Sequence, residues 1–303
     1  MKRIFSEFMK ALYNNSFVFT TEIEPKKTVN PEGIINLARK FKNHVIACNI
    51  TDNPRAHAYM NSIAASYIIQ REVGLETICH MTVRDRNRLA LISDVLGACA
   101  LGIKNILTIT GDHTTMGDNP NAMPVYDIDS TQFIYMLRKM VDEGIDLAGN
   151  KIDGEVRIHI GAVGNPNANP FEPEILKIKR KINAGVEFIQ TQIVFDVERA
   201  KRFIEELKAP PPFILIGIFP CNSYRMAEFI DKKVPGISVP NEYKEVLKKA
   251  NENKEKIDES NIEYFSEMIK ELKKTTRASG IHIMTIKYED IVGKIIDSVK
   301  GIC

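Results

Sequence analysis

The sequence lacks the features that mark membrane-spanning, secreted and metal-cluster proteins. Its longest strongly apolar stretch, residues 213–219, is far too short to cross a bilayer, and residues 1–10 lack the apolar core of a signal peptide. The five cysteines are odd in number and widely spaced, and no C-x-x-C pair predicts a zinc site, an iron–sulfur cluster or a disulfide framework. We therefore expect a cytoplasmic protein with reduced thiols at Cys48, Cys79, Cys99, Cys221 and Cys303.

A strong net charge is also absent. Lys and Arg total 41 against 39 Asp and Glu, and the net charge of +2 provides no broad field that would attract nucleic acid or an anionic membrane. Hydrophobic residues make up 44% of the chain and charged residues 26%, which leaves ample apolar surface for a folded core. We expect a globular protein that binds neither nucleic acid nor membrane and holds any anionic ligand by local groups.

Short β-branched runs alternate with longer helical patterns along the chain, which is typical of repeated βα units around a parallel sheet. The runs predict eight strands, at residues 17–23, 45–50, 76–81, 105–109, 156–163, 188–193, 213–219 and 281–286. The helical patterns cover residues 31–42, 55–71, 86–101, 131–143, 172–184, 197–208, a long stretch over 222–274, and 289–299.

The number of units and the chain length together predict the fold. A chain of 303 residues is close to the length at which an eight-unit barrel forms one domain. We therefore predict an α/β protein with a single (β/α)₈ TIM-barrel domain over residues 1–303, with a helical, charge-rich stretch at about 240–278 between strands seven and eight. An open doubly wound sheet is the alternative, but no G-x-G-x-x-G follows the first strand.

Barrel enzymes carry their chemistry at the C-terminal ends of the strands, and the predicted strand ends here are strongly polar. Glu22 ends the first strand, Gln192 ends the sixth and Lys287 follows the eighth. The other groups at strand ends are Thr51, Asp52, His80, Thr110, Gly111, Asp112, His113, Asn222 and Tyr224. Because few of these residues suit packing, their concentration at one end of the strands predicts an active site.

Taken singly, these residues have ordinary structural alternatives. Glu22 and Asp112 also suit the cap of a helix, His80 a hydrogen-bonded core position, and Lys287 a solvent-exposed one. The collective pattern favours a catalytic site. A metal site is not expected, because His80 and His113 have no i, i+4 partner and the carboxylates are not clustered as ligands.

Seven motifs follow one another along almost the whole chain: TTEIEP, NITDNP, CHMT, TGDH, KRKINAGVEFIQTQIVFD, GIFPCNSY and HIMTIK. In this order they resemble the methylenetetrahydrofolate reductase family. KRKINAG followed by TQIVFD is the most specific segment, whereas a lone TGD would be weak. The added regulatory domain of animal enzymes is absent, so the chain resembles the short bacterial or archaeal catalytic form.

The resemblance implies a flavin held against the strand ends, reduced by NADH or NADPH, and hydride transfer to 5,10-methylenetetrahydrofolate to give 5-methyltetrahydrofolate. The five-membered ring of this substrate must open to an iminium ion, which requires a proton on N10 and favours a nearby negative charge. The family pattern implies that Glu22 is the general acid, with a pKa raised by burial, and that Asp112 stabilises the cation.

The resemblance also implies binding residues. Gln192, Asn222, Tyr224 and Lys287 stand where the family contacts folate or nicotinamide, although Tyr224 alone would equally suit a core aromatic position. The residues implied for the flavin are Thr51, Asp52, His80, Thr110, Gly111, Asp112, Asp127, Glu174, Lys177, Arg180 and Lys181. Arg180 and Lys181 would meet the phosphates, and the alternative for this lysine-rich helix is an ordinary solvated face.

Two departures from the family pattern affect the cofactor. The segment GAVGNPNANP lacks the aromatic and histidine residues usual at this loop, and Thr110 replaces a common basic residue. FAD is the expected cofactor and FMN the alternative. Some relatives in acetogenic bacteria work with a zinc-containing partner subunit, so a partner-dependent reductase with another electron donor is one competing function, and a flavin-free pterin-binding methyltransferase is another. The sequence leaves open whether the chain forms a homo-oligomer.

Overall fold

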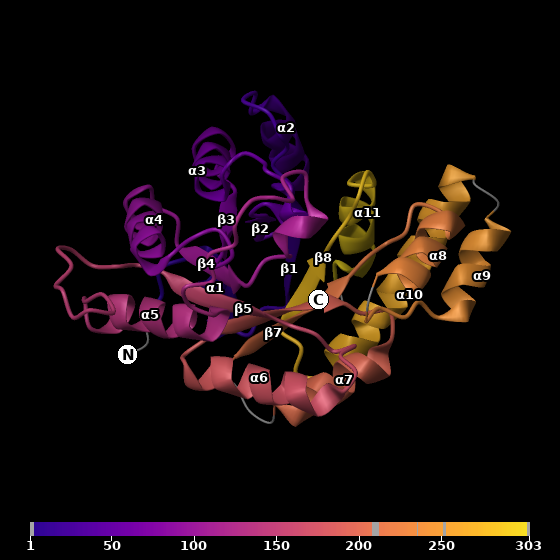
Figure 1. Cartoon of the computed structure of the whole chain (residues 1–303). Coiled ribbons are helices and arrows are strands. Elements are labelled where there is room, and N and C mark those ends of the chain that lie inside the picture. The colour runs from indigo at the N-terminus through magenta and orange to yellow at the C-terminus, as the bar shows by residue number, and fades with distance from the viewer. Residues whose placement is uncertain (1–2, 208–211, 235, 251–252, 302–303) are drawn as a thin grey trace.

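The computed structural model describes residues 3–207, 212–234, 236–250 and 253–301, in which eight parallel strands form a closed barrel (Figure 1). Each strand pairs with the next one along the chain, and β1 pairs with β8 to close the ring. The predicted (β/α)₈ barrel is confirmed. The strands are β1 (Val18–Ile23), β2 (Ala47–Ile50), β3 (Glu76–Thr82), β4 (Asn105–Ile109), β5 (His159–Gly164), β6 (Phe188–Ile193), β7 (Phe213–Ile218) and β8 (Gly280–Ile283).

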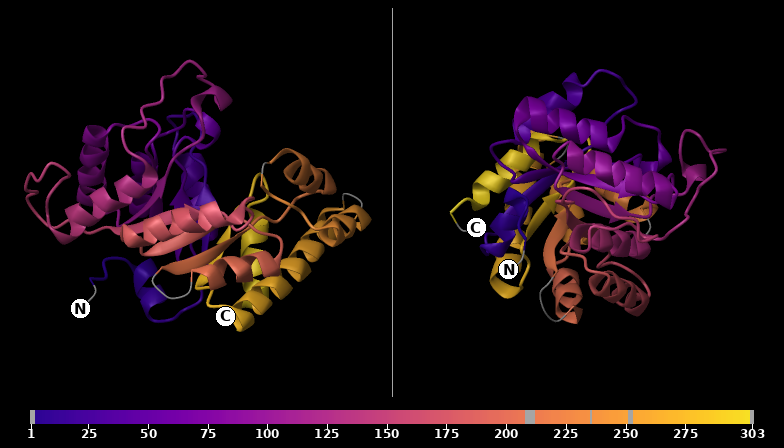
Figure 2. Two further views of the ribbon diagram at one scale, coloured as in Figure 1. Left: turned by 60° about the horizontal axis from the view of Figure 1, so that its bottom comes forward. Right: turned by 90° about the vertical axis from the view of Figure 1, so that its left-hand side faces the viewer.

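Helices surround the strands (Figure 2). Their apolar side chains are buried against the outside of the barrel. Among the described residues, no helix combines the length and the apolar character that a bilayer crossing requires. The helices that follow the strands are α2 (Glu32–Phe41), α3 (Ser62–Val73), α4 (Arg88–Ala100), α5 (Ser130–Asp142), α6 (Phe171–Asn183), α7 (Val197–Glu206), α8 (Tyr224–Lys233), α9 (Asn241–Lys249), α10 (Lys254–Thr275) and α11 (Asp290–Val299).

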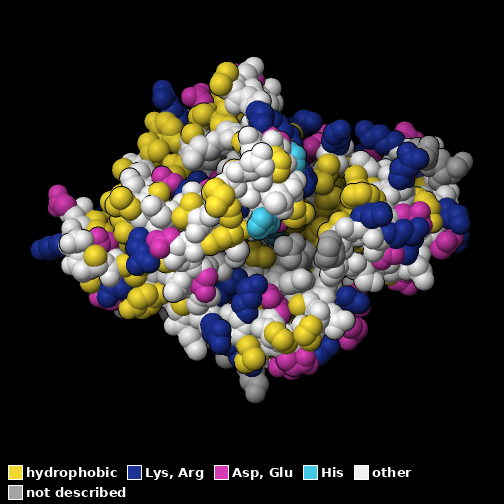
Figure 3. All heavy atoms as spheres, in the orientation of Figure 1, with side chains coloured by type: hydrophobic (Ala, Val, Ile, Leu, Met, Phe, Trp, Pro, Cys, Tyr) yellow, Lys and Arg dark blue, Asp and Glu magenta, His cyan; other side chains and the backbone are white. Residues whose placement is uncertain are grey.

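The helical pattern over 222–274 is divided among α8, α9 and α10. Pro240 precedes α9, and Asn253 caps α10 by accepting a hydrogen bond from the backbone N–H of Lys256. Lys and Arg side chains gather over α8 and α9, as the space-filling view shows (Figure 3). The charge-rich segment between β7 and β8 therefore presents a solvated outer surface.

Two predicted elements have different bounds in the structure, and both changes affect the site. The helix predicted over 55–71 begins only at Ser62, because Asn53, Arg55 and Ala56 have left-handed φ angles of 47°, 55° and 57°. Residues 53–61 instead form a loop beside the C-terminal end of the barrel, with a single 3₁₀ turn, η1 (Pro54–Ala56). β8 ends at Ile283, three residues earlier than predicted, and this difference leaves Lys287 in the loop before α11.

Two smaller differences concern other bounds. β5 begins at His159, three residues later than predicted. Lys208 at the predicted end of a helix, the prolines at 210–211 and Cys303 lie outside the described residues.

A short helix that we did not predict, α1 (Glu7–Tyr13), closes the N-terminal end of the barrel. Its Phe8, Met9 and Leu12 are buried and pack with side chains of the barrel interior. The carboxylate of Glu76 at the start of β3 accepts hydrogen bonds from the backbone N–H groups of Glu7 and Phe8, at 2.9 and 3.1 Å. These N–H groups have no partner within a helix, so the carboxylate satisfies them and anchors the plug.

The barrel interior is stacked in layers, because side chains two positions apart in a strand face the same side. The lowest layer is apolar and packs on α1, and it consists of Val18, Ala47, Ile78, Leu107, Phe188 and Leu215. Two positions further along four of these strands the interior becomes polar, at Thr20, Asn49, His80 and Gln190. Gly161 makes room for this arrangement, since a Cβ there would lie 2.3 Å from the Phe188 ring.

We expect Phe8→Ala to lower the free energy of unfolding by about 3–5 kcal/mol, because it removes a fully buried ring from a rigid interior. The ring packs edge to face on Phe188, with 5.1 Å between centroids and 82° between planes. Chemical denaturation measures the loss. Phe229→Ala, at a side chain 56% exposed on α8, is the matched control and should change the free energy by less than about 0.5 kcal/mol.

Candidate active site

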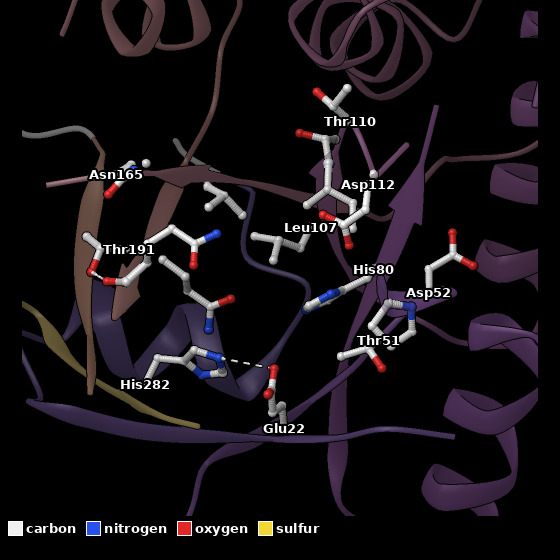
Figure 4. A pocket seen from close by; sticks show the side chains of 18 of the residues that line it. Glu22, Thr51, Asp52, His80, Leu107, Thr110, Asp112, Asn165, Thr191 and His282 are labelled. Atoms are coloured by element: carbon white, nitrogen blue, oxygen red, sulfur yellow. Dashed lines mark hydrogen bonds and ion pairs between the residues drawn. The ribbon is translucent and has the colours of Figure 1, made fainter. Parts of the chain in front are cut away.

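A cavity of about 460 Å³ lies at the C-terminal ends of the strands (Figure 4). Its volume is within the range of small-molecule sites. Eleven of the residues singled out in the sequence line it: Glu22, Thr51, Asp52, His80, Thr110, Gly111, Asp112, Glu174, Lys177, Lys181 and Gln192. The structure therefore brings together groups from the ends of β1, β2, β3, β4 and β6 and from α6.

Six other residues singled out in the sequence do not line this cavity: His113, Asp127, Arg180, Asn222, Tyr224 and Lys287. Asp127 accepts hydrogen bonds from the backbone and side chain of Arg88, and Arg180 is exposed on α6. Tyr224 begins α8, where the Lys248 ammonium lies 5.9 Å from the centre of its ring.

Glu22 lies at the floor of the cavity near the end of β1. Its side chain is 20% exposed, and burial followed by the nearby charge of Glu24 raises its pKa to about 7. Arg55 forms an ion pair with Glu24, at 3.1 Å between Nη2 and Oε1, and opposes this shift only partly. The carboxyl of Glu22 is therefore poised to hold or release a proton near neutral pH.

His282 on β8, which we did not single out from the sequence, is the neighbour of Glu22. Its ring faces the carboxyl of Glu22 (Figure 4), with 4.0 Å between Nε2 and Oε2. Its Nδ1 lies 3.0 Å from Oγ1 of Thr20 on β1. Burial, and secondarily the charge of His80, lowers the pKa of His282 to about 3, so its imidazole is neutral near pH 7. Glu22 therefore sits beside a neutral ring rather than beside a cation.

A buried amide pair connects this corner of the site with His80. Asn49 and Gln190 hydrogen bond to each other through both of their amide groups, and Asn49 Nδ2 also lies 2.9 Å from Nε2 of His80. Burial lowers the pKa of His80 to about 4. The sequence holds a signal for the residues that we missed: Thr20, Asn49 and Gln190 each stand two positions before a residue that we did predict.

The two aspartates of the site have different surroundings. Asp52 is nearly fully buried and is committed to Arg86 and Thr82, with Oδ2 2.6 Å from Nη1 of Arg86 and 2.8 Å from the backbone nitrogen of Thr82. Within the described residues, the Asp112 carboxylate accepts one hydrogen bond, from the backbone N–H of Arg55 at 2.7 Å. Asp52 thus organises the ends of β2 and β3, whereas Asp112 keeps acceptor capacity toward the cavity.

The α6 side of the cavity provides a positive charge, and a polar atom without a partner lies on the β2 side. Lys181 is 3% exposed and donates to the carbonyl of Val163 at 2.8 Å, with no carboxylate of the described residues within ion-pair distance. Burial, followed by the charge of Lys177, lowers its pKa to about 8. The buried hydroxyl of Thr51 has no hydrogen-bond partner among the described residues. A polar, anionic ligand would satisfy both groups.

No group of three or more His, Cys, Asp or Glu side chains in the described part of the chain is arranged to hold a metal ion. The described cysteines are free, and Cys48, Cys79 and Cys221 are buried. Among the described residues that line the cavity, Glu22 offers a carboxyl with a raised pKa, Asp112 a second carboxyl and Lys181 a buried amine.

Comparisons with known proteins identify a family for the chain. The model of the methylenetetrahydrofolate reductase family matches residues 7–300. A probable methylenetetrahydrofolate reductase (NADPH) of Caenorhabditis elegans is 25% identical over 78% of this chain, and methylenetetrahydrofolate reductase 1 of Schizosaccharomyces pombe is 26% identical over 76% of it. The alignments cover only 34% and 36% of those two proteins, so the chain spans about a third of their length.

A shorter relative matches over more of its own length. The 5,10-methylenetetrahydrofolate reductase of Pectobacterium carotovorum is 24% identical over 75% of this chain and 70% of its own. Among solved structures, a Clostridium thermocellum protein described as binding two copies of 5-methyl-5,6,7,8-tetrahydrofolic acid aligns with 98% of this chain and 100% of its own, at a TM-score of 0.67 and 19% identity. A 2,3-dimethylmalate lyase aligns with 97% of this chain and 84% of its own, at a TM-score of 0.52 and 10% identity. These structural likenesses show the shared barrel fold.

We expect Glu22→Gln to stabilise the protein relative to the wild type at pH 8 but not at pH 4. The pKa of Glu22 is about 7 in the folded state against an ordinary value of 4.5, so the folded state retains a proton that the unfolded chain releases. Wild-type stability is therefore lost as pH rises from 4.5 through 7, by up to about 3 kcal/mol in total, and the glutamine variant escapes this loss. Urea unfolding at the two pH values measures the difference, and equal differences at both would contradict the raised pKa.

Proposed function

Because the chain belongs to the methylenetetrahydrofolate reductase family, we propose that it reduces 5,10-methylenetetrahydrofolate to 5-methyltetrahydrofolate with NADH or NADPH as electron donor. The reaction consumes one hydride and one proton per folate, and breaks the bond between the methylene carbon and N10. The observation that carries the proposal is Glu22, a carboxyl with a pKa near 7 on the cavity floor beside a neutral imidazole.

Glu22 is assigned the proton transfer. Its carboxyl holds a proton below pH 7 and can deliver it to N10, the atom that must leave as an amine when the ring opens. Asp112 is assigned the stabilisation of the iminium cation, since its carboxylate faces the cavity and is held in place by the N–H of Arg55. The nearby His282 cannot compete as an acid because it has already lost its charge at neutral pH.

A flavin fits the residues that the cavity presents. When bound, it supplies the hydride that it has accepted from the reduced nicotinamide. Thr51, with its unpartnered hydroxyl, and His80, Thr110 and Gly111 would lie against the flavin, while Lys181, with Lys177 and Glu174 beside it, would face a phosphate. Asp52 would hold the ends of β2 and β3 in place for the flavin through its contacts with Arg86 and Thr82. Asp127 and Arg180, which do not line the cavity, are assigned to the outer part of the flavin site. We propose FAD as the cofactor. Titration of the protein with FAD and with FMN, comparing the two affinities, distinguishes it from FMN.

The remaining folate and nicotinamide contacts are assigned to Gln192 and to the loops after β7 and β8. Gln192 lines the cavity, whereas Asn222, Tyr224 and Lys287 do not, and we assign these three residues to the long tail of a folate. Folate binding is also supported by the folate-binding description of the Clostridium thermocellum structure. We propose that the reaction takes place in the cytoplasm, where cysteines stay reduced, as the free cysteines are here. Two further arrangements are proposed: a homo-oligomer, tested by the mass of the purified protein in solution, and a complex with a zinc-containing partner subunit, tested by copurification.

The test is an anaerobic measurement of the two half-reactions on flavin-loaded protein. Reduced nicotinamide should bleach the flavin absorbance, and 5,10-methylenetetrahydrofolate should restore it. Protein that binds neither FAD nor FMN would contradict the proposal and favour a flavin-free methyltransferase. Flavin-loaded protein that bleaches only with an added partner would identify a partner-dependent reductase.

For Glu22→Gln we expect bleaching by nicotinamide to remain within about twofold of wild type, while reoxidation by the folate slows by roughly 100-fold or more. The wild-type rate of reoxidation should fall above pH 7, because Glu22 with its pKa of about 7 then loses the proton that it must deliver. Glu32→Gln, at an exposed carboxyl in the first turn of α2, is the matched control. Equal loss of both half-reactions would assign Glu22 to flavin binding or folding.

Lys181→Gln should weaken flavin binding by roughly tenfold or more, because it removes the buried cation from the cavity. Lys179→Gln on the same helix changes an exposed side chain and serves as the control, with an effect of less than about twofold. Fluorescence titration with FAD and with FMN measures both variants and ranks the cofactors. Equal affinities for the two lysine variants would show that Lys181 does not contact the ligand.

A further inference from the structure

Five polar side chains form a continuous hydrogen-bonded layer between the apolar plug of the barrel and the cavity. They come from β1, β2, β3, β6 and β8, and none is more than 9% exposed: Thr20, Asn49, His80, Gln190 and His282. Apolar residues would fill this space at less cost, since buried amides stabilise a fold only when their groups are satisfied. The proton transfer assigned to Glu22 gives no role to the amide pair in this layer.

The amide pair has a defined direction. Gln190 Nε2 donates to Asn49 Oδ1 at 3.1 Å, and Asn49 Nδ2 donates to Gln190 Oε1 at 2.6 Å. Each amide has one further N–H, which points outward from the pair. Asn49 directs its N–H to Nε2 of His80 at 2.9 Å, and Gln190 directs its N–H to Oγ1 of Thr20 at 3.1 Å.

Counting donors then determines where each histidine carries its proton. Thr20 accepts from Gln190, and its own hydroxyl proton is satisfied when it donates to Nδ1 of His282 at 3.0 Å. A ring nitrogen that accepts a hydrogen bond carries no proton, so the neutral ring of His282 has its N–H at Nε2, the atom facing Glu22. By the same rule the neutral ring of His80 has its N–H at Nδ1.

We propose that Gln190, paired with Asn49, is a positioning residue that fixes the tautomer of His282 through Thr20, so that an N–H faces the Glu22 carboxyl. The kinetic part of this inference rests on the proposed function, whereas the tautomer does not. An N–H directed at Glu22 stabilises the carboxylate that remains after the proton has left, which is the charged product of the acid step. The gap of 4.0 Å exceeds a hydrogen bond, so the contact must shorten as that charge develops.

The orientation of the two amides is the critical premise. If both were reversed, every donor in the layer would become an acceptor, and His282 would carry its proton on Nδ1 and present a lone pair to Glu22. The two amide orientations therefore make opposite predictions for whether Nε2 of His282 carries a proton. Within the described residues, the Thr20 hydroxyl hydrogen bonds only to Gln190 and His282. Whether Thr20 donates to His282 or accepts from it therefore depends on Gln190.

The experiment is ¹⁵N NMR of the full chain with labelled histidine, in which the His282 signals are identified by their loss in His282→Gln. The chain has six histidines, so the spectrum is simple enough to assign. We expect the wild type to show a protonated Nε2 and an unprotonated Nδ1 at pH 7. In Gln190→Met the Nε2–H form should fall to a mixture, because Thr20 is then free to accept from Nδ1. A protonated Nδ1 in the wild type, or an unchanged tautomer in Gln190→Met, would overturn the proposal.

A second variant tests the same tautomer in case Gln190→Met does not fold. Thr20→Val keeps the shape of the side chain but removes the hydroxyl between Gln190 and His282, so it should shift the same tautomer. Gln70→Met is the matched control, because Gln70 also hydrogen bonds to a threonine, Thr77 at 3.0 Å, but at the opposite end of the barrel. Gln70→Met should leave the tautomer of His282 unchanged. A shift of this tautomer equal to that in Gln190→Met would refute a specific effect of Gln190 on His282.

The kinetic readout separates this inference from the proposed function. Gln190→Met should slow reoxidation by the folate roughly tenfold, with flavin reduction and folate affinity within about twofold of wild type. Equal slowing of both half-reactions would contradict the positioning role. If the wild type reduces no folate, the proposed function fails, and the NMR tautomer still decides whether Gln190 acts on His282.

Discussion

The alternation of side chains along closed, parallel strands is the constraint on which the rest of this structure depends. Residues two apart in a strand share the barrel interior, so a strand of six residues supplies side chains at three levels. In β1 these are Val18, Thr20 and Glu22, which are apolar, polar and ionisable in that order. The interior therefore changes from a dry plug to a reactive cavity within one strand length.

This layering explains why a carboxyl can stay protonated at the cavity floor. Glu22 lies above a polar layer whose groups hydrogen bond to one another, and no Lys or Arg of the described residues lies within ion-pair distance of its carboxyl. Asp52, only one strand away, is also buried but faces the guanidinium of Arg86 and the N–H of Thr82. Two carboxylates in one cavity thus serve different purposes, because one has a buried partner of opposite charge and the other does not.

The loops at the cavity mouth depend on the same strand ends. The loop with left-handed residues at Asn53, Arg55 and Ala56 is held by the Asp112 carboxylate, which accepts a hydrogen bond from the backbone N–H of Arg55. It also depends on Gly117, where a Cβ would lie 1.8 Å from the carbonyl oxygen of Ala56. A larger residue at 117 would displace this loop from the site. The catalytic role that we propose for Asp112 and its hold on this loop would therefore be coupled through a single side chain.

The sequence by itself determined the barrel and eleven of the 23 residues that line its cavity. β-branched runs separated by helical patterns identify eight strands, and the C-terminal ends of parallel strands must meet at one face, so the positions of Glu22, Asp52 and Asp112 in the chain suffice to group them. Tertiary structure decided what each of these groups touches. The plug helix α1, the loop in place of a helix at residue 55, and the links from His282 through Thr20 to Gln190 join residues far apart in the chain. Such contacts depend on strand register and on donor geometry, which local sequence patterns do not encode.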